Sequence, residues 1–208
     1  MAFFHGSILC MKLVFATNNP HKLQEIGALL GGSFRLSGLQ DVGISDSLPE
    51  DRDTLEGNAS QKARYVYERC RMNCFADDTG LEVYGLNGAP GVYSARYSRI
   101  GNPVFPEMEV SAGNIKKLLQ VMEGMQDRRA RFRTVISLIL NDIEYYFEGI
   151  VEGEIATEPA GQKGFGYDPV FRPAGYDRTF AEMNLSLKNR ISHRAKAVER
   201  LVEFLRNM

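Results

Sequence analysis

The chain has 208 residues, 44% of them hydrophobic and 25% charged, which is enough to bury one substantial core or two lobes. Its 25 Lys and Arg residues nearly balance its 26 Asp and Glu residues, and the formal net charge of -1 excludes a global positive field that would hold nucleic acid or an anionic membrane. The sequence shows no apolar run of membrane-span length and no secretory signal, and its three cysteines match neither a zinc cluster nor a disulfide framework, so we expect a cytoplasmic location.

The first half of the chain predicts a strand, a helix, a second strand and a second helix. Residues 12–16 are typical of a short buried strand, and apolar residues then recur at helical spacing from Leu23 to Leu30. Asn19 is a suitable cap for this helix, and Pro20 suits its first position. A second strand is expected within residues 34–39. An acidic loop at residues 45–53 then precedes a helix whose apolar face carries Ala59, Ala63, Val66 and Cys70.

The second half predicts three further strands and two further helices. Residues 74–76 indicate a buried strand that ends at Asp77-Asp78-Thr79-Gly80, and residues 85–91 form a loop rich in Gly and Pro. A helix is expected from Val110 to Met122. Residues 131–140 and 143–155 indicate two long strands joined at Asn141-Asp142, and Ser192 caps a final helix that runs to Met208.

These elements predict an α/β fold with a mixed sheet, in a single domain that covers residues 11–208. The sequence has no linker, internal repeat or low-complexity tract that would divide it. Because Met11 directly precedes a strong strand pattern, we expect translation to start there and residues 1–10 to be an extension.

A phosphate site is predicted where the first strand meets the first helix. Thr17-Asn18-Asn19 and Pro20 lead into Lys22 in the opening helical turn, so free backbone N–H groups and one ammonium converge on one point. The same pattern also fits a capped helix with a solvated lysine.

A metal site is predicted at the two adjacent carboxylates that follow the strand at residues 74–76. Neighbouring side chains of an extended strand point to opposite faces, so we assign Asp78 to the site and expect Asp77 to hold the loop by hydrogen bonds. A second acidic ligand is expected from the loop or helix that contains Glu50, Asp51, Asp53 and Glu56. We place Lys62 on the exposed side of that helix, facing the same phosphate group.

Two further motifs predict contacts to a planar ligand. In Gly164-Phe165-Gly166-Tyr167-Asp168 the glycines allow close backbone approach, Phe165 offers a stacking face and Asp168 accepts hydrogen bonds. In Ser192-His193-Arg194, positive side chains lie at the positive end of a helix dipole and require compensation, either from a ligand or from a carboxylate of the protein.

Taken in order, the motifs TNNPHK (17–22), ADDTGLEV (76–83), GAPGVYSARY (88–97), GFGYDPVF (164–171) and SHR (192–194) resemble the inosine/xanthosine triphosphate pyrophosphatase family. The resemblance extends over nearly the whole chain from Met11. It implies an elongated mixed sheet flanked by helices, two lobes around a nucleotide-binding cleft, a homodimer and a Mg²⁺ cofactor.

The resemblance also implies roles for individual residues. The segment Thr17, Asn18, Asn19, Pro20, His21 and Lys22 binds substrate and holds the triphosphate, Asp78 binds magnesium and acts as base, and Thr79 lines the site. Phe165, Gly166, Tyr167, Asp168, Lys188, His193 and Arg194 enclose the base and sugar. Family members often carry two acidic residues where this chain has Leu55-Glu56-Gly57-Asn58-Ala59. We therefore favour Glu50 as the second metal ligand, with Glu56 as the alternative.

The implied activity is hydrolysis of ITP, dITP and XTP to the monophosphate and pyrophosphate, with water attacking the α-phosphorus and Asp78 orienting or deprotonating that water. Donors near Lys188 would read the purine 6-oxo group. Two alternatives stay open: a pyrophosphatase for pyrimidine triphosphates such as dTTP or UTP, and a nucleotide-binding protein without activity.

Overall fold

The structure is a computed structural model that describes residues 11–30, 34–101 and 104–208, so the predicted extension at residues 1–10 lies outside the described residues. The strands are β1 (Lys12–Phe15), β2 (Arg35–Ser37), β3 (Cys74–Val83), β4 (Pro90–Gly91), β5 (Arg129–Leu140), β6 (Ile143–Ile155) and β7 (Phe171–Pro173). The α-helices are α1 (Pro20–Leu30), α2 (Leu55–Cys70), α3 (Val110–Val121), α4 (Leu185–Ile191) and α5 (His193–Arg206). Short 3₁₀-helices are η2 (Gln40–Val42), η3 (Tyr84–Leu86), η4 (Ser94–Arg99) and η5 (Phe180–Glu182).

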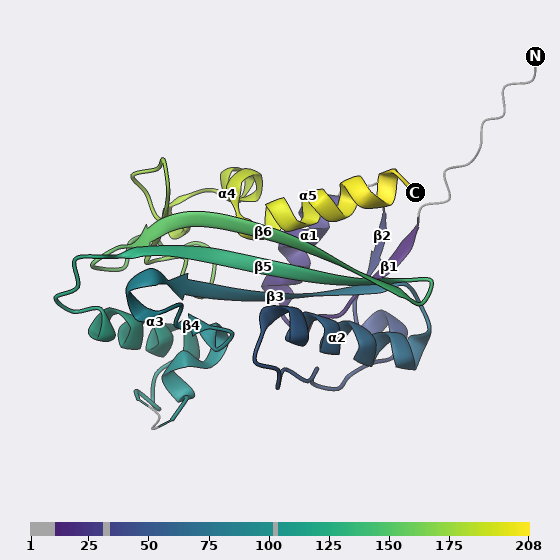
Figure 1. Ribbon diagram of the computed structural model, residues 1–208, viewed down its shortest axis with the longest axis horizontal. Helices are drawn as coiled ribbons and strands as arrows, with labels where there is room; N and C mark the ends of the chain where they lie inside the picture. The colour runs from purple at the N-terminus through teal and green to yellow at the C-terminus, as the bar shows by residue number, and fades with distance from the viewer. Residues whose placement is uncertain (1–10, 31–33, 102–103) are drawn as a thin grey trace, which may run out of the picture.

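The described strands form one mixed sheet in the order β2-β1-β3-β5-β6-β7, with β4 paired to β3. β1 is parallel to β2 and β3, whereas the pairs β3–β5, β5–β6 and β6–β7 are antiparallel. The long strands β5 and β6 run along the molecule, with α1 and α5 on one side of the sheet and α2 on the other (Figure 1). The predicted α/β class with a mixed, helix-flanked sheet is confirmed.

Alternating residues of β1 enter two separate cores. Leu13 and Phe15 pack with Ile26 of α1 in the core on one face of the sheet. Val14 points to the opposite face, where it packs with Val66 of α2. Each fully buried side chain of this size contributes roughly 1.5–3 kcal/mol, so the alternation fixes which helix covers which face.

A third core lies toward the other end of the long strands. Leu81 of β3 and Phe132 of β5 pack there with Leu118 of α3, Phe171 of β7 and Phe180 of η5. The continuous strands β3 and β5 join the two ends of the molecule, which gives the two lobes expected from the resemblance. In the described part of the chain, no helix combines the length and apolar character needed to cross a membrane.

The turn between β5 and β6 forms as predicted. Asn141 and Asp142 have φ angles of 49° and 68°, and they connect strands that pair from Leu140–Ile143 to Arg129–Glu154. Two adjacent residues with positive φ match the twist of a two-residue hairpin.

The strand β3 is longer than predicted. The sequence analysis ended it at Ala76, whereas the strand continues through Val83. The reason is β5, which pairs with β3 from Cys74–Ile139 to Val83–Ala130 and satisfies the backbone of the polar segment.

The other edge of β3 is open where this extension begins. The pairing with β1 ends at Phe15–Phe75, and β4 pairs only with Leu81 and Glu82. Residues 77–80 of β3 therefore have a strand neighbour on one side only, and this gap in the sheet is where polar side chains gather.

Candidate functional site

A cavity of about 790 Å³ opens beside residues 77–80 of β3. This volume falls within the ~300–1,000 Å³ typical of small-molecule sites. The cavity is lined by every residue predicted to bind substrate and by the two favoured metal ligands: Thr17, Asn18, Asn19, Pro20, His21, Lys22, Glu50, Lys62, Asp78, Thr79, Phe165, Gly166, Tyr167, Asp168, Lys188, His193 and Arg194. Their common location supports a single site, and their individual roles stay predictions.

The segment before α1 is ordered by its own side chains. Asn19 Oδ1 accepts hydrogen bonds from the N–H groups of His21 (2.9 Å) and Lys22 (3.4 Å), and Thr17 Oγ1 accepts one from the N–H of Asn19 (3.1 Å). The predicted Asn19 cap is confirmed. The expected free N–H groups already have acceptors, because the capping side chains occupy them.

Asn18, in the same segment, forms hydrogen bonds with the loop before α2. Its Oδ1 accepts from the N–H of Leu48 (3.2 Å), and its amide donates to the carbonyl of Asp46 (3.3 Å). Asn18 therefore fixes the loop before α2 against the start of α1.

Six charged side chains form a buried ion-pair chain, and four of them also line the cavity. Lys22 pairs with Asp77 (3.0 Å), Asp77 with Arg194 (3.3 Å), Arg194 with Glu25, and Lys188 with both Glu25 (2.7 Å) and Asp168 (2.7 Å). Cations and carboxylates alternate along it, so three charges of each sign cancel. Neutrality matters because an unpaired buried charge costs several kcal/mol.

Asp77 belongs to this chain, and its Oδ2 also accepts a hydrogen bond from Thr79 Oγ1 (3.3 Å) in the segment that it was predicted to hold, although that segment is strand rather than loop. Burial alone would raise the pKa of Asp77, but Lys22 and Arg194 hold it well below its usual range. The carbonyl of Asp77 lies on the open edge of β3 and accepts a hydrogen bond from Lys22 Nζ (3.4 Å). Arg194 at the start of α5 is thus compensated by carboxylates of the protein, which is one of the two alternatives that the sequence left open.

Asp78 points to the opposite face from Asp77, as expected for neighbours on a strand. Its Oδ1 lies 3.3 Å from Lys62 Nζ, and Glu50 Oε1 contacts the same ammonium. Burial would lower the pKa of Lys62, but Asp78 and Glu50 raise it above its ordinary value. The predicted exposure of Lys62 is wrong: its side chain is buried between α2 and β3 because it pairs with both carboxylates.

The carboxylates of Asp78 and Glu50, here called the acidic pair, fit a magnesium ion. Both reach one point at the Lys62 ammonium, and the other oxygen of Glu50 lies 4.0 Å from Arg96 Nη1. Burial raises the pKa of Asp78 despite nearby Lys62 and Lys22, so a further cation would favour its charged form. Among the described residues there is no cluster of three or more His, Cys, Asp or Glu that could hold a metal. Magnesium suits such a site, because it commonly uses one or two carboxylates and completes its shell with water and phosphate oxygens.

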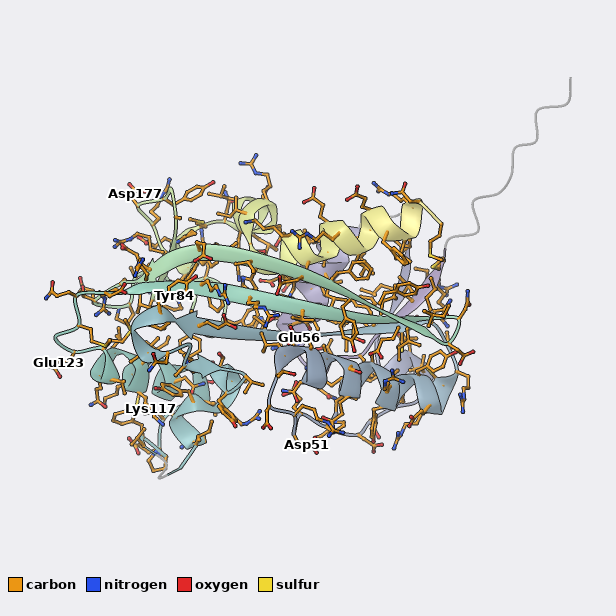
Figure 2. All side chains as sticks on the ribbon, in the orientation of Figure 1. Asp51, Glu56, Tyr84, Lys117, Glu123 and Asp177 are labelled. Carbon is orange, nitrogen blue, oxygen red and sulfur yellow. The ribbon has the colours of Figure 1, made fainter. Side chains whose placement is uncertain are left out.

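The alternative ligand Glu56 lies elsewhere. Its carboxylate pairs with Arg133 of β5, outside the residues that line the cavity. Figure 2 shows Glu56 at the start of α2, beside the long strands. This placement favours Glu50 over Glu56 as the second ligand.

The end of the cavity lining that contains Phe165 and Lys188 is aromatic and cationic. Phe165 sits between Gly164 (φ 75°) and Gly166 (φ 61°), and its N–H donates to Asp168 Oδ2 (2.8 Å). A side chain at Gly164 would place Cβ 2.0 Å from that same oxygen, so only glycine permits this turn. Lys188 Nζ lies 4.9 Å from the centroid of the Phe165 ring.

Two histidines border this end in different ways. The ring of His21 is exposed and stacks on Phe165, with centroids 5.3 Å apart and planes 12° from parallel. His193 is buried and stacks on Phe132 at 4.6 Å. Burial, together with Arg194 and Lys188, lowers the pKa of His193 well below its ordinary value, so the ring is neutral. Its Nδ1 is buried and has no hydrogen-bond partner among the described residues.

The sequence analysis missed part of the lining: Ser47, Leu48, Ser94, Ala95, Val110, Ser111, Asn114 and Phe132. Ser94 and Ala95 lie within the motif at residues 88–97, which was noted without assigning them to the site. Tyr167 donates from its hydroxyl to the carbonyl of Ser94 (3.0 Å), which joins these two segments of the lining. No local pattern marks Phe132, because only the register of β5 brings it beside His193.

The fold and cavity define an α/β protein whose site suits a planar, multiply anionic ligand together with a divalent cation. The Ham1 family model matches residues 13–204, and the chain belongs to the Ham1 family. This confirms the resemblance inferred from the motifs.

Individual relatives are similar in sequence to this chain over almost their whole length. The dITP/XTP pyrophosphatase of Porphyromonas gingivalis is 51% identical over 195 residues, which cover 93% of this chain and 97% of the relative. That of Flavobacterium johnsoniae is 48% identical over 195 residues, covering 94% and 98%. Among solved structures, the Staphylococcus aureus Ham1 protein has a TM-score of 0.82 at 36% identity, with 94% of this chain and 98% of that chain covered.

Proposed function

We propose that this protein is a magnesium-dependent pyrophosphatase that converts ITP, dITP and XTP to the nucleoside monophosphate and pyrophosphate. The observation that carries the proposal is a single cavity that is lined both by the acidic pair and by Phe165 and neutral His193. Relatives that share 48–51% of their residues over nearly the full length are dITP/XTP pyrophosphatases. We also propose that the protein acts in the cytoplasm, where it would remove such nucleotides from the nucleotide pool.

The acidic pair would act at the phosphate end of the cavity. Asp78 and Glu50 would hold the magnesium ion, which when bound neutralises charge on the phosphate oxygens. Asp78 would also orient a water for in-line attack on the α-phosphorus and accept its proton, with pyrophosphate leaving. Lys22 and Lys62 line the same part of the cavity and would place ammonium groups near the triphosphate.

The aromatic end would recognise the base. A purine would stack on Phe165, and such a contact typically contributes ~1–3 kcal/mol per base. The neutral ring of His193 would lie beside the base, and Lys188 would be a donor for the 6-oxo group. A site built to donate to a 6-oxo group leaves its donors unpaired when adenine presents an amino group.

The proposal includes a homodimer, as the resemblance implies. Size-exclusion chromatography with light scattering would measure the mass in solution. A mass of one chain would contradict this part of the proposal without affecting the activity.

The experiment that tests the activity is pyrophosphate release from a panel of ITP, dITP, XTP, GTP, ATP, dTTP and UTP, with magnesium and with a chelator. We expect magnesium-dependent turnover of ITP, dITP and XTP far above that of GTP and ATP. Preference for dTTP or UTP would assign the protein to pyrimidine nucleotides instead. Binding without turnover of any substrate would make it a nucleotide-binding protein.

A further inference from the structure

Asn58, in the first turn of α2, makes two hydrogen bonds that join separate parts of the site. Its side chain is buried, with 1% of its surface exposed. The amide nitrogen donates to Asp78 Oδ2 (3.1 Å), and the amide oxygen accepts from the backbone N–H of Arg52 (2.9 Å). This orientation of the amide is fixed by its partners, because a carboxylate accepts and a backbone N–H donates.

The first of these bonds gives the two oxygens of the Asp78 carboxylate different partners. Oδ2 is engaged by Asn58, while Oδ1 faces Lys62 at 3.3 Å. A carboxylate held by one oxygen cannot rotate freely about its last bond. The orientation of the other oxygen toward the acidic pair is thereby set.

The second bond acts on the loop that carries Glu50. Arg52 lies two residues after Glu50, so the bond to its N–H anchors the loop at the start of α2. The guanidinium of Arg96 also donates to the carbonyl of Glu50 (3.2 Å). The loop is therefore fixed at Glu50 itself and two residues after it.

If Asn58 had only a structural role, it would serve to hydrogen-bond the loop before α2. Gln61, one turn further along α2, already makes such hydrogen bonds. Its amide donates to Asp51 Oδ1 (2.6 Å) and accepts from the N–H of Asp51 (3.3 Å). Figure 2 shows Asp51 on the outer side of this loop, below α2. Gln61 thus makes the same kind of bridge as Asn58, but only Asn58 extends it to Asp78.

We propose that Asn58 is a positioning residue for the reaction: it orients Asp78 and ties it to the loop of Glu50, so that the two carboxylates keep one relative position. The inference rests on the proposed function, since it concerns the same acidic pair. Asn58 acts through Asp78, and its role requires no contact with substrate.

Two variants separate the two bonds, and a third is the control. Asn58→Asp keeps the acceptor for Arg52 but replaces the donor to Asp78 by an oxygen. Asn58→Ala removes both bonds without adding a charge. Gln61→Ala removes a bridge to the same loop and leaves Asp78 untouched. Circular dichroism establishes that each variant is folded, and the test uses the Asn58 variant that keeps the wild-type spectrum.

We expect kcat for ITP to fall by about 10- to 100-fold in both Asn58 variants, with KM changing much less, because the loss is one of alignment. Gln61→Ala should keep kcat within about twofold of wild type, well short of that loss. Hydrogen exchange of residues 45–53 should quicken in Asn58→Ala and Gln61→Ala but not in Asn58→Asp. Magnesium affinity, measured by calorimetry without nucleotide, should weaken at least about tenfold in Asn58→Ala only.

The proposal is overturned if Gln61→Ala loses as much kcat as the Asn58 variants, since loop mobility would then explain both. It is also overturned if Asn58→Ala binds magnesium as tightly as wild type. If wild-type protein fails to hydrolyse ITP, the proposed function fails, while calorimetry and hydrogen exchange still decide the role of Asn58.

Discussion

Glu25 is the residue on which the buried ion-pair chain depends most. Its two carboxylate oxygens contact Arg194 Nη1 and Lys188 Nζ, and both cations are almost fully buried. In Glu25→Gln the side chain keeps its shape but loses its charge. The chain then holds three cations against two carboxylates, Asp77 and Asp168.

The expected loss of stability follows from this imbalance. Removing one partner of a buried ion pair typically costs ~3–5 kcal/mol, because the remaining charge is desolvated and uncompensated. Glutamine retains one oxygen acceptor, which places the expected loss near the lower value, about 3 kcal/mol. That is a large part of the ~5–15 kcal/mol that stabilises a typical domain.

Urea unfolding followed by circular dichroism measures this loss, as a lower midpoint with an unchanged slope. The matched control is Glu154→Gln, whose carboxylate pairs with Arg172 at the surface (2.8 Å) and should change stability by less than ~1 kcal/mol. A change in Glu25→Gln as small as in the control would refute the argument that the chain is held by charge balance.

Three further predictions concern buried groups elsewhere. The pKa of His193 in the folded protein lies below its value of 6.5 in the unfolded chain, so the free energy of unfolding falls as the pH drops below 6.5. About 1.4 kcal/mol should be lost between about pH 7.5 and 5.5, and much less in His193→Phe. A stability independent of pH over this range would contradict the neutral ring. A Cβ at Gly149 would lie 2.0 Å from the carbonyl of His193, so Gly149→Ala should lose about 1–3 kcal/mol in urea unfolding, whereas Gly27→Ala, with nothing within 4 Å, should not destabilise α1. Equal stability of the two variants would count against the close contact of α5 with β6. Burial raises the pKa of the Cys74 thiol to about 12, so iodoacetamide should label it only after unfolding; rapid labelling of the native protein would refute this.

Local sequence patterns were sufficient to predict the elements that are marked by alternation, turn residues or a helix cap. The bounds of β6 and the hairpin at Asn141-Asp142 follow from alternation and turn chemistry, and Ser192 caps α5 by accepting from the N–H of Ala195 (3.1 Å). The length of β3 did not follow, because its polar segment is held in the sheet by β5, a partner more than fifty residues away in the sequence. The short helix α4, capped by Asn184, was also missed, since seven residues give too little periodicity.

The site shows the same division between local and tertiary information. The motifs contain residues that line one cavity, but they do not predict how those residues pair with one another. Lys62 was predicted to be exposed because an isolated helical lysine usually is, and its burial depends on Asp78 from another element. Glu25 was not noticed at all, although it follows Lys22 by three positions and so shares its face of α1. Its partners Arg194 and Lys188 lie at the far end of the chain.

Asp78, on the open edge of β3, is in our proposal the reacting carboxylate of a purine nucleoside triphosphate pyrophosphatase. The most direct test is the rate of pyrophosphate release from ITP by wild type and by Asp78→Asn under saturating magnesium. We predict a loss of about 10²- to 10⁴-fold in kcat for a variant that keeps the wild-type fold. Near-normal turnover by Asp78→Asn would contradict the account.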